Sequence, residues 1–559
     1  MQAIYNIAEI CAQKGIKNIV LSPGSRCAPL TIAFARHPNF RPYTISDERS
    51  AAFIALGMAL QTKTPSVLVC TSGTATLNYA PAIAEAFFQQ VPLLILTADR
   101  PQEWIAQQDG QTIYQQNIYG KHVKGSYQLP SDFSHPDANW FVERTLSEAT
   151  NKAQAYPPGP VHINIPLREP LYPSGTIKFD QNVKVITELS GSPSIAEEDR
   201  NRILKQISTY SKIMVVAGQN TTDTALTEVL TEFSNNYNIP IVADIIANQK
   251  HPDFINGHDL FINNINPAQY QPEVLITFGM SLISKGMKLF LRKNKPTIHI
   301  HLDPQGIAAD PFQSLTMVVR ETPVHFLREA INAGLLYHNE AFGNLWKQAS
   351  NKGVEKLNHF LNSNKEWSEI SAVNQVIAHL PANSSLHLAN SMPVRYAGFV
   401  FAGQEMKGVE CFANRGTSGI DGVISTAYGM ALLSSKTITV ITGDLSFFYD
   451  RNALWNNYLP GNLKIILLNN HGGNIFRIID GPNQQPELEE YFETHQPLNA
   501  RRTAEDAGFN YIKVNNSVQL KEGLKQIYSN NKPYILEAEF DGKVSHQVFC
   551  DFKETLKSM

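Results

Sequence analysis

Two stretches of the sequence decide the fold: ITVITGD at residues 438–444 and KIILLNNHGGN at residues 464–474. Each is a short apolar run, typical of a buried strand, that ends in a polar and glycine-rich turn. The 26 residues that separate Asp444 from Asn470 are enough for one strand–helix–strand crossover between parallel strands. We therefore expect Asp444 and Asn470 to stand side by side at the edge of a parallel sheet where such folds bind ligands.

The same alternation of apolar runs and helical segments recurs along the chain. Further strands are predicted at Asn18–Leu21, Ser66–Cys70, Val91–Thr97, Val161–Ile165, Ile213–Ala217, Pro240–Ala243, Val274–Phe278, Thr297–Leu302, Ser385–Ala389 and Tyr534–Glu539. Helices are predicted at Glu48–Leu60 and Thr221–Phe233, a polar helical connector on the surface at Glu340–Leu361, and a linker at 174–194. This alternation favours an α/β fold with parallel sheets covered on both faces. We expect three doubly wound domains, at residues 1–180, 195–335 and 365–559.

Composition excludes several classes of protein. The 559 residues are 43% hydrophobic and 17% charged, with a net charge of −3, so neither a disordered chain nor a surface that attracts nucleic acid is expected. No run approaches the roughly 20 apolar residues of a membrane-spanning helix. Met1–Gly15 has the spacing of an amphipathic helix that includes Glu9, so no signal peptide is expected. Five scattered cysteines without a Cys-x-x-Cys pair predict no disulfide framework or zinc site and favour a reducing cytoplasm.

Asp444, Asn470 and the backbone carbonyl of Gly472 form a candidate metal site. A carboxylate, an amide oxygen and a free carbonyl are hard oxygen ligands that suit Mg²⁺, which normally keeps phosphate oxygens and water in its other positions. Both segments are also ordinary turn signals, since Gly-Asp and Asn-His-Gly favour loops. Their pairing at a crossover spacing favours the metal site.

These two stretches resemble the cofactor signature of thiamine-diphosphate-dependent enzymes. In that family the Asp, the second Asn and a carbonyl two residues later hold the metal that grips the diphosphate, and the matching positions are Asp444, Asn470 and Gly472. Leu445 replaces the last glycine of the usual Gly-Asp-Gly. The resemblance implies thiamine diphosphate with Mg²⁺, or Mn²⁺, as cofactors. It also implies that the three domains are a pyrimidine-binding N-terminal, a central, and a diphosphate-binding C-terminal domain.

The resemblance also implies a catalytic glutamate that hydrogen-bonds the aminopyrimidine ring of the cofactor. Glu48 has the expected place, near the start of a helix after the second strand of the first domain, although acidic residues favour any helix N-terminus. Ile420 lies in the glycine-rich stretch 414–422 and matches the apolar residue that bends the cofactor, or else is a core residue. Further cofactor contacts are expected at Ser391, Ile475 and Phe476.

Basic residues gather at the ends of predicted strands. Arginine binds carboxylates through a fixed two-pronged fork, so several arginines at one edge predict a pocket for a dicarboxylate, although surface loops carry arginine too. The candidate substrate contacts are Arg26, Arg100, Arg395 and Arg415, with Ser25 and Gln111 as polar orienting groups.

Within the family, the closest resemblance is to the branch of menaquinone biosynthesis that decarboxylates 2-oxoglutarate and adds the succinyl unit to isochorismate. The strings that carry it are Ser22–Arg26, Asp47–Arg49, Thr97–Pro101, Asn390–Arg395, 414–422 and Gly443–Ser446. Leu445 is expected in this branch. The central domain matches through Lys285, a further expected substrate contact, although Gly286 follows where some relatives carry a second basic residue.

The resemblance further implies a transferase that works as a homodimer or homotetramer. The cofactor is then expected between the first domain of one chain and the third domain of its partner. No nucleic acid and no membrane insertion are expected. Two alternatives stay open: another thiamine-diphosphate carboligase or decarboxylase of 2-oxo acids, and a non-catalytic relative that binds the cofactor.

Overall fold

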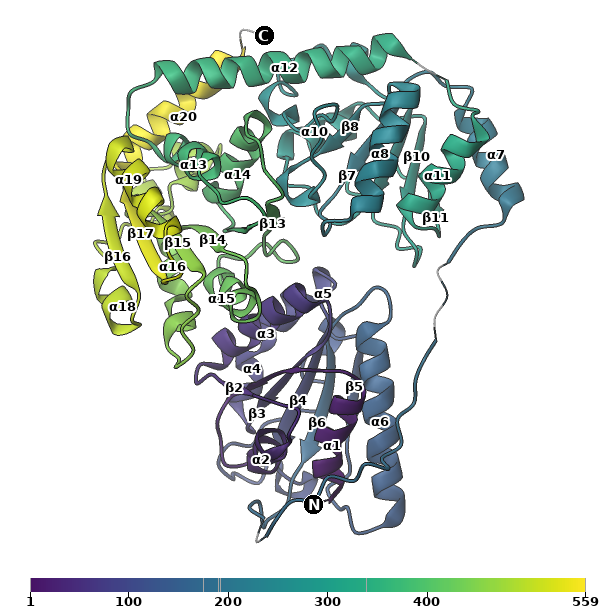
Figure 1. The fold of residues 1–559 in the computed structure, drawn as a ribbon, viewed down its shortest axis with the longest axis vertical. Coiled ribbons are helices and arrows are strands. Elements are labelled where there is room, and N and C mark those ends of the chain that lie inside the picture. Colours follow the sequence, from purple (N-terminus) through teal and green to yellow (C-terminus); the bar gives the residue numbers. More distant parts are fainter. Residues whose placement is uncertain (1, 174, 190, 192, 338, 558–559) are drawn as a thin grey trace.

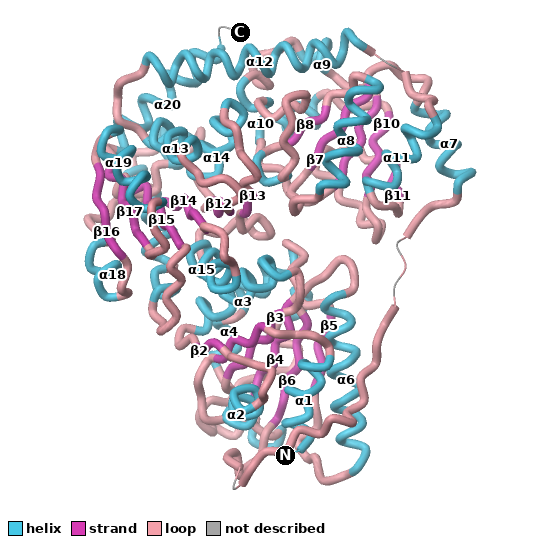
Figure 2. The backbone as a smooth tube through the Cα atoms, in the orientation of Figure 1, coloured by secondary structure: helices cyan, strands magenta, loops and turns pink. Residues whose placement is uncertain are grey.

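The computed structural model describes residues 2–173, 175–189, 191, 193–337 and 339–557. The chain forms three units, each built on one sheet (Figure 1). All the strand pairs within these sheets are parallel. Figure 2 shows the strands inside each unit and the helices around them. The predicted fold class, three α/β units with parallel sheets, is confirmed.

The first unit contains a six-stranded sheet of order β2-β1-β3-β4-β6-β5. Its strands are β1 (Asn18–Leu21), β2 (Tyr43–Thr44), β3 (Ser66–Cys70), β4 (Leu93–Asp99), β5 (Gly125–Gln128) and β6 (Val161–Pro166). Its helices are α1 (Gln2–Gln13), α2 (Ala28–Arg36), α3 (Glu48–Thr62), α4 (Thr74–Asn78), α5 (Ala80–Phe88) and α6 (Pro136–Gln154). Helix α1 is buried from Ala3 to Cys11, Glu9 included, so it is a core helix and not the half-exposed amphipathic helix that was predicted.

The middle unit contains a five-stranded sheet of order β11-β10-β9-β7-β8. Its strands are β7 (Ile213–Ala217), β8 (Ile241–Ala243), β9 (Val274–Phe278), β10 (Ile298–Leu302) and β11 (Met317–Val319). Its helices are α7 (Glu197–Ile207), α8 (Thr224–Tyr237), α9 (Pro267–Tyr270), α10 (Lys285–Lys293) and α11 (Pro323–Ala333). The predicted linker 174–194 includes positions 174, 190 and 192, which lie outside the described residues; its described part has no helix or strand.

The third unit repeats the strand order of the first, as β13-β12-β14-β15-β17-β16. Its strands are β12 (Ser385–Leu388), β13 (Glu410–Phe412), β14 (Ile438–Gly443), β15 (Leu463–Asn469), β16 (Asn510–Val514) and β17 (Tyr534–Glu539). Its helices are α13 (Glu369–Ala378), α14 (Met392–Val400), α15 (Val423–Leu433), α16 (Asp444–Tyr449), α17 (Ile475–Ile478), α18 (Arg501–Asp506), α19 (Ser517–Tyr528) and α20 (Gly542–Lys557).

Helix α12 (Glu340–Ser363) connects the middle and third units along the top of Figure 1. The sequence predicts it as a polar surface connector, but one of its faces is buried. Trp346 is fully buried and packs edge-on against the rings of Phe261, Tyr270 and Phe290. The helix is therefore part of the middle unit's core as well as a connector.

Helices α3 and α15 join the first and third units through one continuous apolar core. Glycines allow the two backbones to touch: a Cβ at Gly57 would lie 1.9 Å from the carbonyl oxygen of Thr426, and one at Gly429 would lie 2.0 Å from that of Ile54. Real side chains do not fit at such distances, so both glycines are required by this close approach. The contact fixes how the sheet ends of the two units face each other.

Candidate active site

The predicted metal residues follow two neighbouring strands of the third sheet. Strand β14 pairs with β15 in parallel register, with Gly443 opposite Leu468. Asp444 therefore begins α16 next to the point where Asn470 leaves β15. Asp444 is buried, and its Oδ2 accepts a hydrogen bond of 2.7 Å from Gln496 Nε2. Burial raises the pKa of the Asp444 carboxyl to about 6, although a hydrogen bond from the Gly472 amide counters this.

A buried glutamate behind this loop holds two asparagine side chains in place. Glu369, the first residue of α13, is 2% exposed. Its Oε1 accepts a hydrogen bond of 2.9 Å from Asn470 Nδ2, and its Oε2 accepts one of 3.1 Å from Asn474 Nδ2. With both amide NH₂ groups turned toward Glu369, the amide oxygens point the other way. Burial raises the pKa of Glu369 to about 7, and the nearby Asp444 charge adds to the shift.

The residues present fit a hard divalent cation and a diphosphate. Within the described part of the chain, no three His, Cys, Asp or Glu side chains cluster as a metal site, so any cation here depends on a carboxylate, an amide and a carbonyl. Asp444 and Asn470 present oxygen atoms at one sheet edge, and Asn474 Oδ1 is buried with no hydrogen-bond partner among the described residues. A Cβ built on Gly443 would meet nothing within 4 Å. Oxygen donors beside open space are the arrangement that Mg²⁺ with phosphate oxygens requires.

Glu48 begins α3 with its carboxylate unengaged. The preceding Asp47 caps the helix by accepting a hydrogen bond of 2.9 Å from Ser50 N, and also accepts one of 2.8 Å from Asn452 Nδ2. Glu48 is half-buried and has no hydrogen-bond or ion-pair partner among the residues that the structure describes. Burial raises the pKa of the Cys70 thiol at the end of β3, and the Glu48 charge adds to this. The Glu48 carboxylate therefore lies near the end of β3, at the carboxyl end of the first sheet.

The other predicted cofactor residues surround the loops of the third unit. Ile420 is 40% exposed, and its carbonyl accepts a hydrogen bond of 2.6 Å from Ser446 Oγ. Ser391 precedes α14 with φ at +70°, a strained conformation for a residue with a side chain. Ile475 and Phe476 are half-buried at the start of α17.

The predicted substrate residues of the first unit lie on the segments that follow β1 and β4. Arg26 is buried and donates to the Leu167 carbonyl at 3.0 Å, while Ser25 beside it is exposed. Arg100 donates to the Gly110 carbonyl at 3.0 Å. Gln111 is exposed, with its Cα 3.3 Å from where a Cβ on Gly73 would lie.

The predicted substrate residues of the third unit converge on the end of β12. Arg415 Nη1 donates to Asn390 Oδ1 at 2.8 Å, and Arg395 Nη1 donates to the Ser391 carbonyl. Among the described residues, no hydrogen bond or ion pair connects Arg395 or Arg415 with the first-unit set of Ser25, Arg26, Arg100 and Gln111. The predicted substrate residues of these two units thus form two sets, a first-unit half-site and a third-unit half-site.

The middle unit carries Lys285, its predicted substrate contact, at the start of α10. Lys285 is exposed, with no hydrogen-bond or ion-pair partner in the described part of the chain. Gly286 cannot be replaced by a larger residue without rearrangement, since its Cβ would lie 2.8 Å from Ile262 Cγ2. Lys288, one turn along α10, is half-buried and lies near Arg415. Sequence reasoning missed Lys288, Glu369 and Gln496, which belong to no recognisable motif, and it gave Asn474 no role although this residue ends the stretch 464–474.

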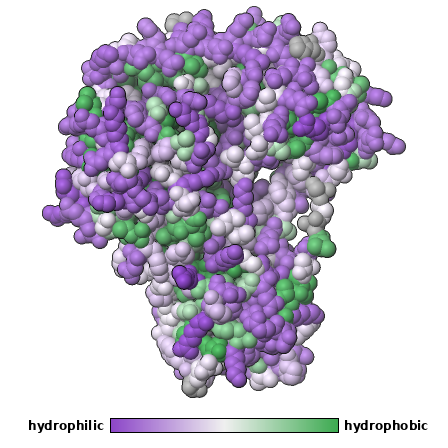
Figure 3. Space-filling view, in the orientation of Figure 1, coloured by the Kyte–Doolittle hydropathy of each residue, from purple (hydrophilic) through white to green (hydrophobic). Residues whose placement is uncertain are grey.

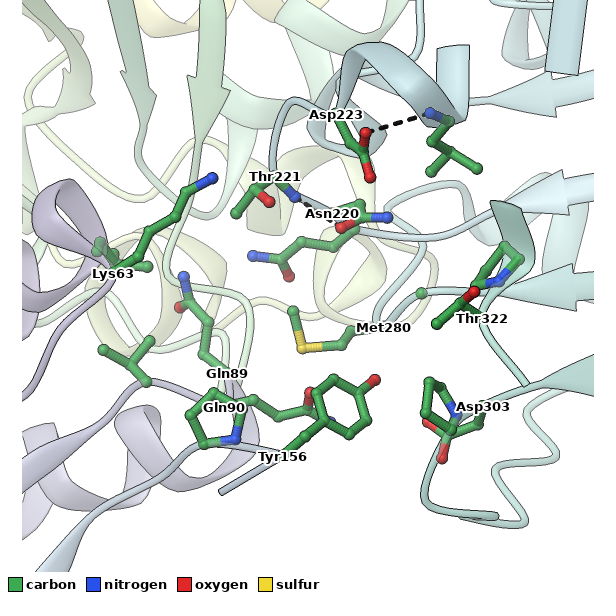
Figure 4. A pocket seen from close by; sticks show the side chains of 18 of the residues that line it. Lys63, Gln89, Gln90, Tyr156, Asn220, Thr221, Asp223, Met280, Asp303 and Thr322 are labelled. Carbon is green, nitrogen blue, oxygen red and sulfur yellow. Dashed lines mark hydrogen bonds between the residues drawn. The ribbon is translucent and has the colours of Figure 1, made fainter. Parts of the chain in front are cut away.

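A cavity of about 480 Å³ lies between the first and middle units, away from these residues (Figure 4). Its walls include Gln90, Tyr156, Met280 and Asp303. None of the predicted cofactor or substrate residues lines it. A neighbouring cavity of about 820 Å³ shares Gln90 and Met280 but reaches Lys288 and Arg415.

Comparison with known proteins agrees with this geometry. Residues 1–119 match the N-terminal TPP binding domain of thiamine pyrophosphate enzymes, and residues 405–538 match their C-terminal TPP binding domain. A protein of Cytophaga hutchinsonii is 46% identical over 100% of this chain and 99% of its own length. Proteins of Flavobacterium johnsoniae and Flavobacterium psychrophilum are 41% and 39% identical, over 95% and 99% of this chain and 95% and 98% of their own lengths. All three are named 2-succinyl-5-enolpyruvyl-6-hydroxy-3-cyclohexene-1-carboxylate synthase.

Proposed function

Since the chain belongs to the 2-succinyl-5-enolpyruvyl-6-hydroxy-3-cyclohexene-1-carboxylate synthase family of thiamine-diphosphate enzymes, we propose how its residues carry out that synthesis. The reaction releases CO₂ from 2-oxoglutarate and adds the succinyl unit to isochorismate by 1,4-addition, a step of menaquinone biosynthesis. The observation that carries the proposal is the placement of Asp444 beside the Asn470–Gly472 loop at the ends of neighbouring strands.

The third unit would hold the cofactor by its diphosphate. When bound, thiamine diphosphate supplies the nucleophilic carbon and the electron sink for decarboxylation. Asp444, Asn470 and the Gly472 carbonyl would hold Mg²⁺, or Mn²⁺, against the diphosphate. Ile475, Phe476 and Ser391 would border the cofactor, and the exposed Ile420 would pack against its ring system.

Glu48 would be the catalytic acid–base group. A carboxylate with no partner in its own chain can accept or donate a hydrogen bond at the cofactor's ring nitrogen, and so hold the proton that the reaction moves. Its half-buried position over the first sheet leaves it reachable from outside the chain.

The arginines would bind the two dicarboxylate substrates. Each guanidinium can hold a carboxylate through two parallel hydrogen bonds, which fixes the orientation of the substrate as well as its charge. Arg26, Arg100, Ser25 and Gln111 would contribute from the first unit, and Arg395 and Arg415 from the third. Lys285, exposed at the start of α10, would contribute from the middle unit.

Two half-sites in one chain support a homodimer, or a homotetramer built from it. A second copy would bring Glu48 and Arg26 of its first unit against Asp444 and Arg415 of the third. Figure 3 shows hydrophobic residues along the seam between these two units, and Ile420 and Leu77 are 40% and 47% exposed. All five cysteines are free thiols, which supports a reducing compartment such as the cytoplasm. No helix in the described residues is long and apolar enough to cross a bilayer.

The proposal is tested by turnover of the purified protein with Mg²⁺, thiamine diphosphate, 2-oxoglutarate and isochorismate, with one component omitted at a time. We expect CO₂ release to require the cofactor and 2-oxoglutarate, and the adduct to require all four components. Decarboxylation of pyruvate in preference to 2-oxoglutarate would instead identify a different carboligase. Cofactor binding without any CO₂ release would identify a non-catalytic relative.

A further inference from the structure

Gln496 contacts both segments of the candidate metal site, although it belongs to neither. Its side-chain Nε2 donates to Asp444 Oδ2 at 2.7 Å, just after β14. Its backbone N–H donates to the His471 carbonyl at 3.0 Å, and its own carbonyl oxygen lies 3.1 Å from His471 Nδ1. His471 stands between Asn470 and Gly472, the other two proposed ligands. One residue therefore connects the ends of β14 and β15 across the site.

The half-buried side chain of Gln496 is itself held in place. Its Oε1 accepts a hydrogen bond of 2.6 Å from Leu498 N, and its Nε2 also donates to Asn469 Oδ1 at 3.3 Å. Asn469, the last residue of β15, is fully buried and donates to the Leu498 carbonyl at 3.0 Å. The amide of Gln496 is therefore fixed against β15 while it points at Asp444. A supporting group that is locked by its own hydrogen bonds can hold a ligand in one orientation.

The Asp444 carboxylate is oriented by these contacts and still has room for a cation. Its Oδ1 accepts a hydrogen bond of 2.8 Å from Leu445 N, and the Gly472 amide also donates to the carboxylate. Among the described residues, Gln496 is the one side chain that hydrogen-bonds it. An ionised carboxylate has about four lone-pair sites, so these three hydrogen bonds leave one for a metal ion. Hydrogen bonds on the rest of a ligating carboxylate normally fix its orientation.

We propose that Gln496 is a positioning residue for metal binding: it turns the Asp444 carboxylate toward the cation and fixes the backbone of the Asn470–Gly472 loop through His471. A neutral amide suits this task, because it donates hydrogen bonds without a positive charge that would compete with the cation. This rests on the proposed function, in which Asp444, Asn470 and Gly472 hold Mg²⁺.

Two substitutions separate the hydrogen bond from the size of the side chain. Gln496→Met keeps the length and removes the donor. Gln496→Asn keeps the amide but is shorter by one methylene group, so the amide no longer reaches Asp444. Gln485→Met is the matched control, because Gln485 is exposed in the same segment and its side chain has no hydrogen-bond partner among the described residues.

The binding of thiamine diphosphate to each protein is measured by calorimetry over a series of Mg²⁺ concentrations, together with the Tm of the cofactor-free protein. We expect both Gln496 variants to need about 10- to 100-fold more Mg²⁺ for half-maximal cofactor binding, the usual cost of losing a group that orients a metal ligand. Saturating Mg²⁺ should restore cofactor binding, because only the metal affinity is weakened. The Tm values, and all measurements on Gln485→Met, should stay close to wild type.

A Mg²⁺ requirement within about twofold of wild type in either Gln496 variant would overturn the inference. A loss of cofactor binding that excess Mg²⁺ does not restore would also overturn it, since a purely structural defect does not respond to the metal. Cofactor binding by wild type without any divalent cation would overturn it together with the proposed metal site. If wild type binds the cofactor with Mg²⁺ but releases no CO₂, the proposed reaction fails, and the comparison of Mg²⁺ requirements still decides the role of Gln496.

Discussion

The first and third units have the same strand order but place different side chains after corresponding strands. Strand β3 of the first sheet corresponds to β14 of the third, and β4 corresponds to β15. After β14 and β15 the third unit places Asp444 and Asn470, oxygen ligands for a cation. After β4 the first unit places Arg100, a ligand for an anion. Topology therefore decides where a ligand binds, and a few side chains decide which ligand it is.

The helices that follow the equivalent edge strands differ in the same way. Helix α3 begins at Glu48, whereas α15 follows the exposed Ile420, and the two helices pack against each other at Gly57 and Gly429. We infer that the acid–base function lies entirely in the first unit and the metal function entirely in the third. Two substitutions, Glu48→Gln and Glu369→Gln, test this division, and the first has the larger expected effect.

Glu48→Gln should have the largest effect and should act on turnover alone. Because the carboxylate moves a proton in the proposed reaction, kcat is expected to fall by about 10²- to 10⁴-fold. Glu48 has no partner among the described residues, so the Tm of the protein without cofactor should match wild type. Glu197→Gln is the matched control, since Glu197 is also the first residue of a helix and is exposed. A kcat for Glu48→Gln within threefold of wild type would contradict the division.

Glu369→Gln should instead weaken metal binding in the third unit. Asn470 and Asn474 donate to different oxygens of Glu369. A glutamine puts an NH₂ group in place of one of these oxygens, so one of the two asparagines meets a donor and is freed to rotate away from the site. Loss of such a supporting group costs about 10- to 100-fold in metal affinity. Titration with Mg²⁺ at a fixed concentration of thiamine diphosphate measures this metal affinity. Glu366→Gln, on an exposed residue just before α13, should leave the affinity unchanged; an equal loss in both variants would remove Glu369 from the site.

The sequence predicts the centre of each sheet far better than its edges. Strands β1, β3, β7 and β9 begin and end at the predicted residues because central strands are buried on both faces and form continuous apolar runs. The strands that were not predicted all lie at sheet edges: β2, β5, β11, β13 and β16. Edge strands are short or face water, and some of their sequences, such as GSYQ in β5, carry no apolar run.

The site shows the same limit. Asp444, Asn470 and Gly472 are recognisable because each belongs to a loop that directly follows a predicted strand. Glu369 lies 101 residues before Asn470, at the start of a helix where an acidic residue has an ordinary explanation. Only the packing of α13 behind the loop gives it a role, and packing between distant segments leaves no pattern in the sequence.

Substitutions at the contact between α3 and α15, the seam of the first and third units, test whether both helices need a glycine there. Gly57→Ala and Gly429→Ala each place a methyl group within 2.0 Å of a backbone carbonyl oxygen of the facing helix. Each should lower the free energy of unfolding by about 1–3 kcal/mol or more, because the helices must separate. Gly398→Ala in α14 is the control: its Cβ meets nothing within 4 Å, so it should be neutral or stabilising by up to about 1 kcal/mol. Destabilisation by only one of the seam variants would show that the seam is not symmetric.

The smallest expected effect is a pH dependence of stability. It comes from one buried histidine in the first unit and one in the third. Burial lowers the pKa of His162 in β6 and of His387 in β12 to about 3, against about 6.5 in the unfolded chain. Below pH 6.5 the unfolded chain takes up a proton that the folded chain refuses. Each neutral histidine therefore makes its full contribution to the free energy of unfolding above pH 6.5, and this contribution is lost as pH falls toward 3.

Between pH 6.5 and 5.5 each histidine should lower the free energy of unfolding by about 1 kcal/mol. The free energy of unfolding is measured by chemical denaturation at each pH. His162→Gln and His387→Gln should each reduce its change with pH by that amount, whereas His359→Gln, on an exposed residue of α12, should not. His162 has a partner, Thr97 Oγ1 at 2.7 Å from Nε2, whereas both ring nitrogens of His387 are buried with none among the described residues. His387→Gln should consequently cost less stability at pH 7.5 than His162→Gln, because no hydrogen bond is broken. An equal cost at pH 7.5 would mean that the two buried histidines are supported alike.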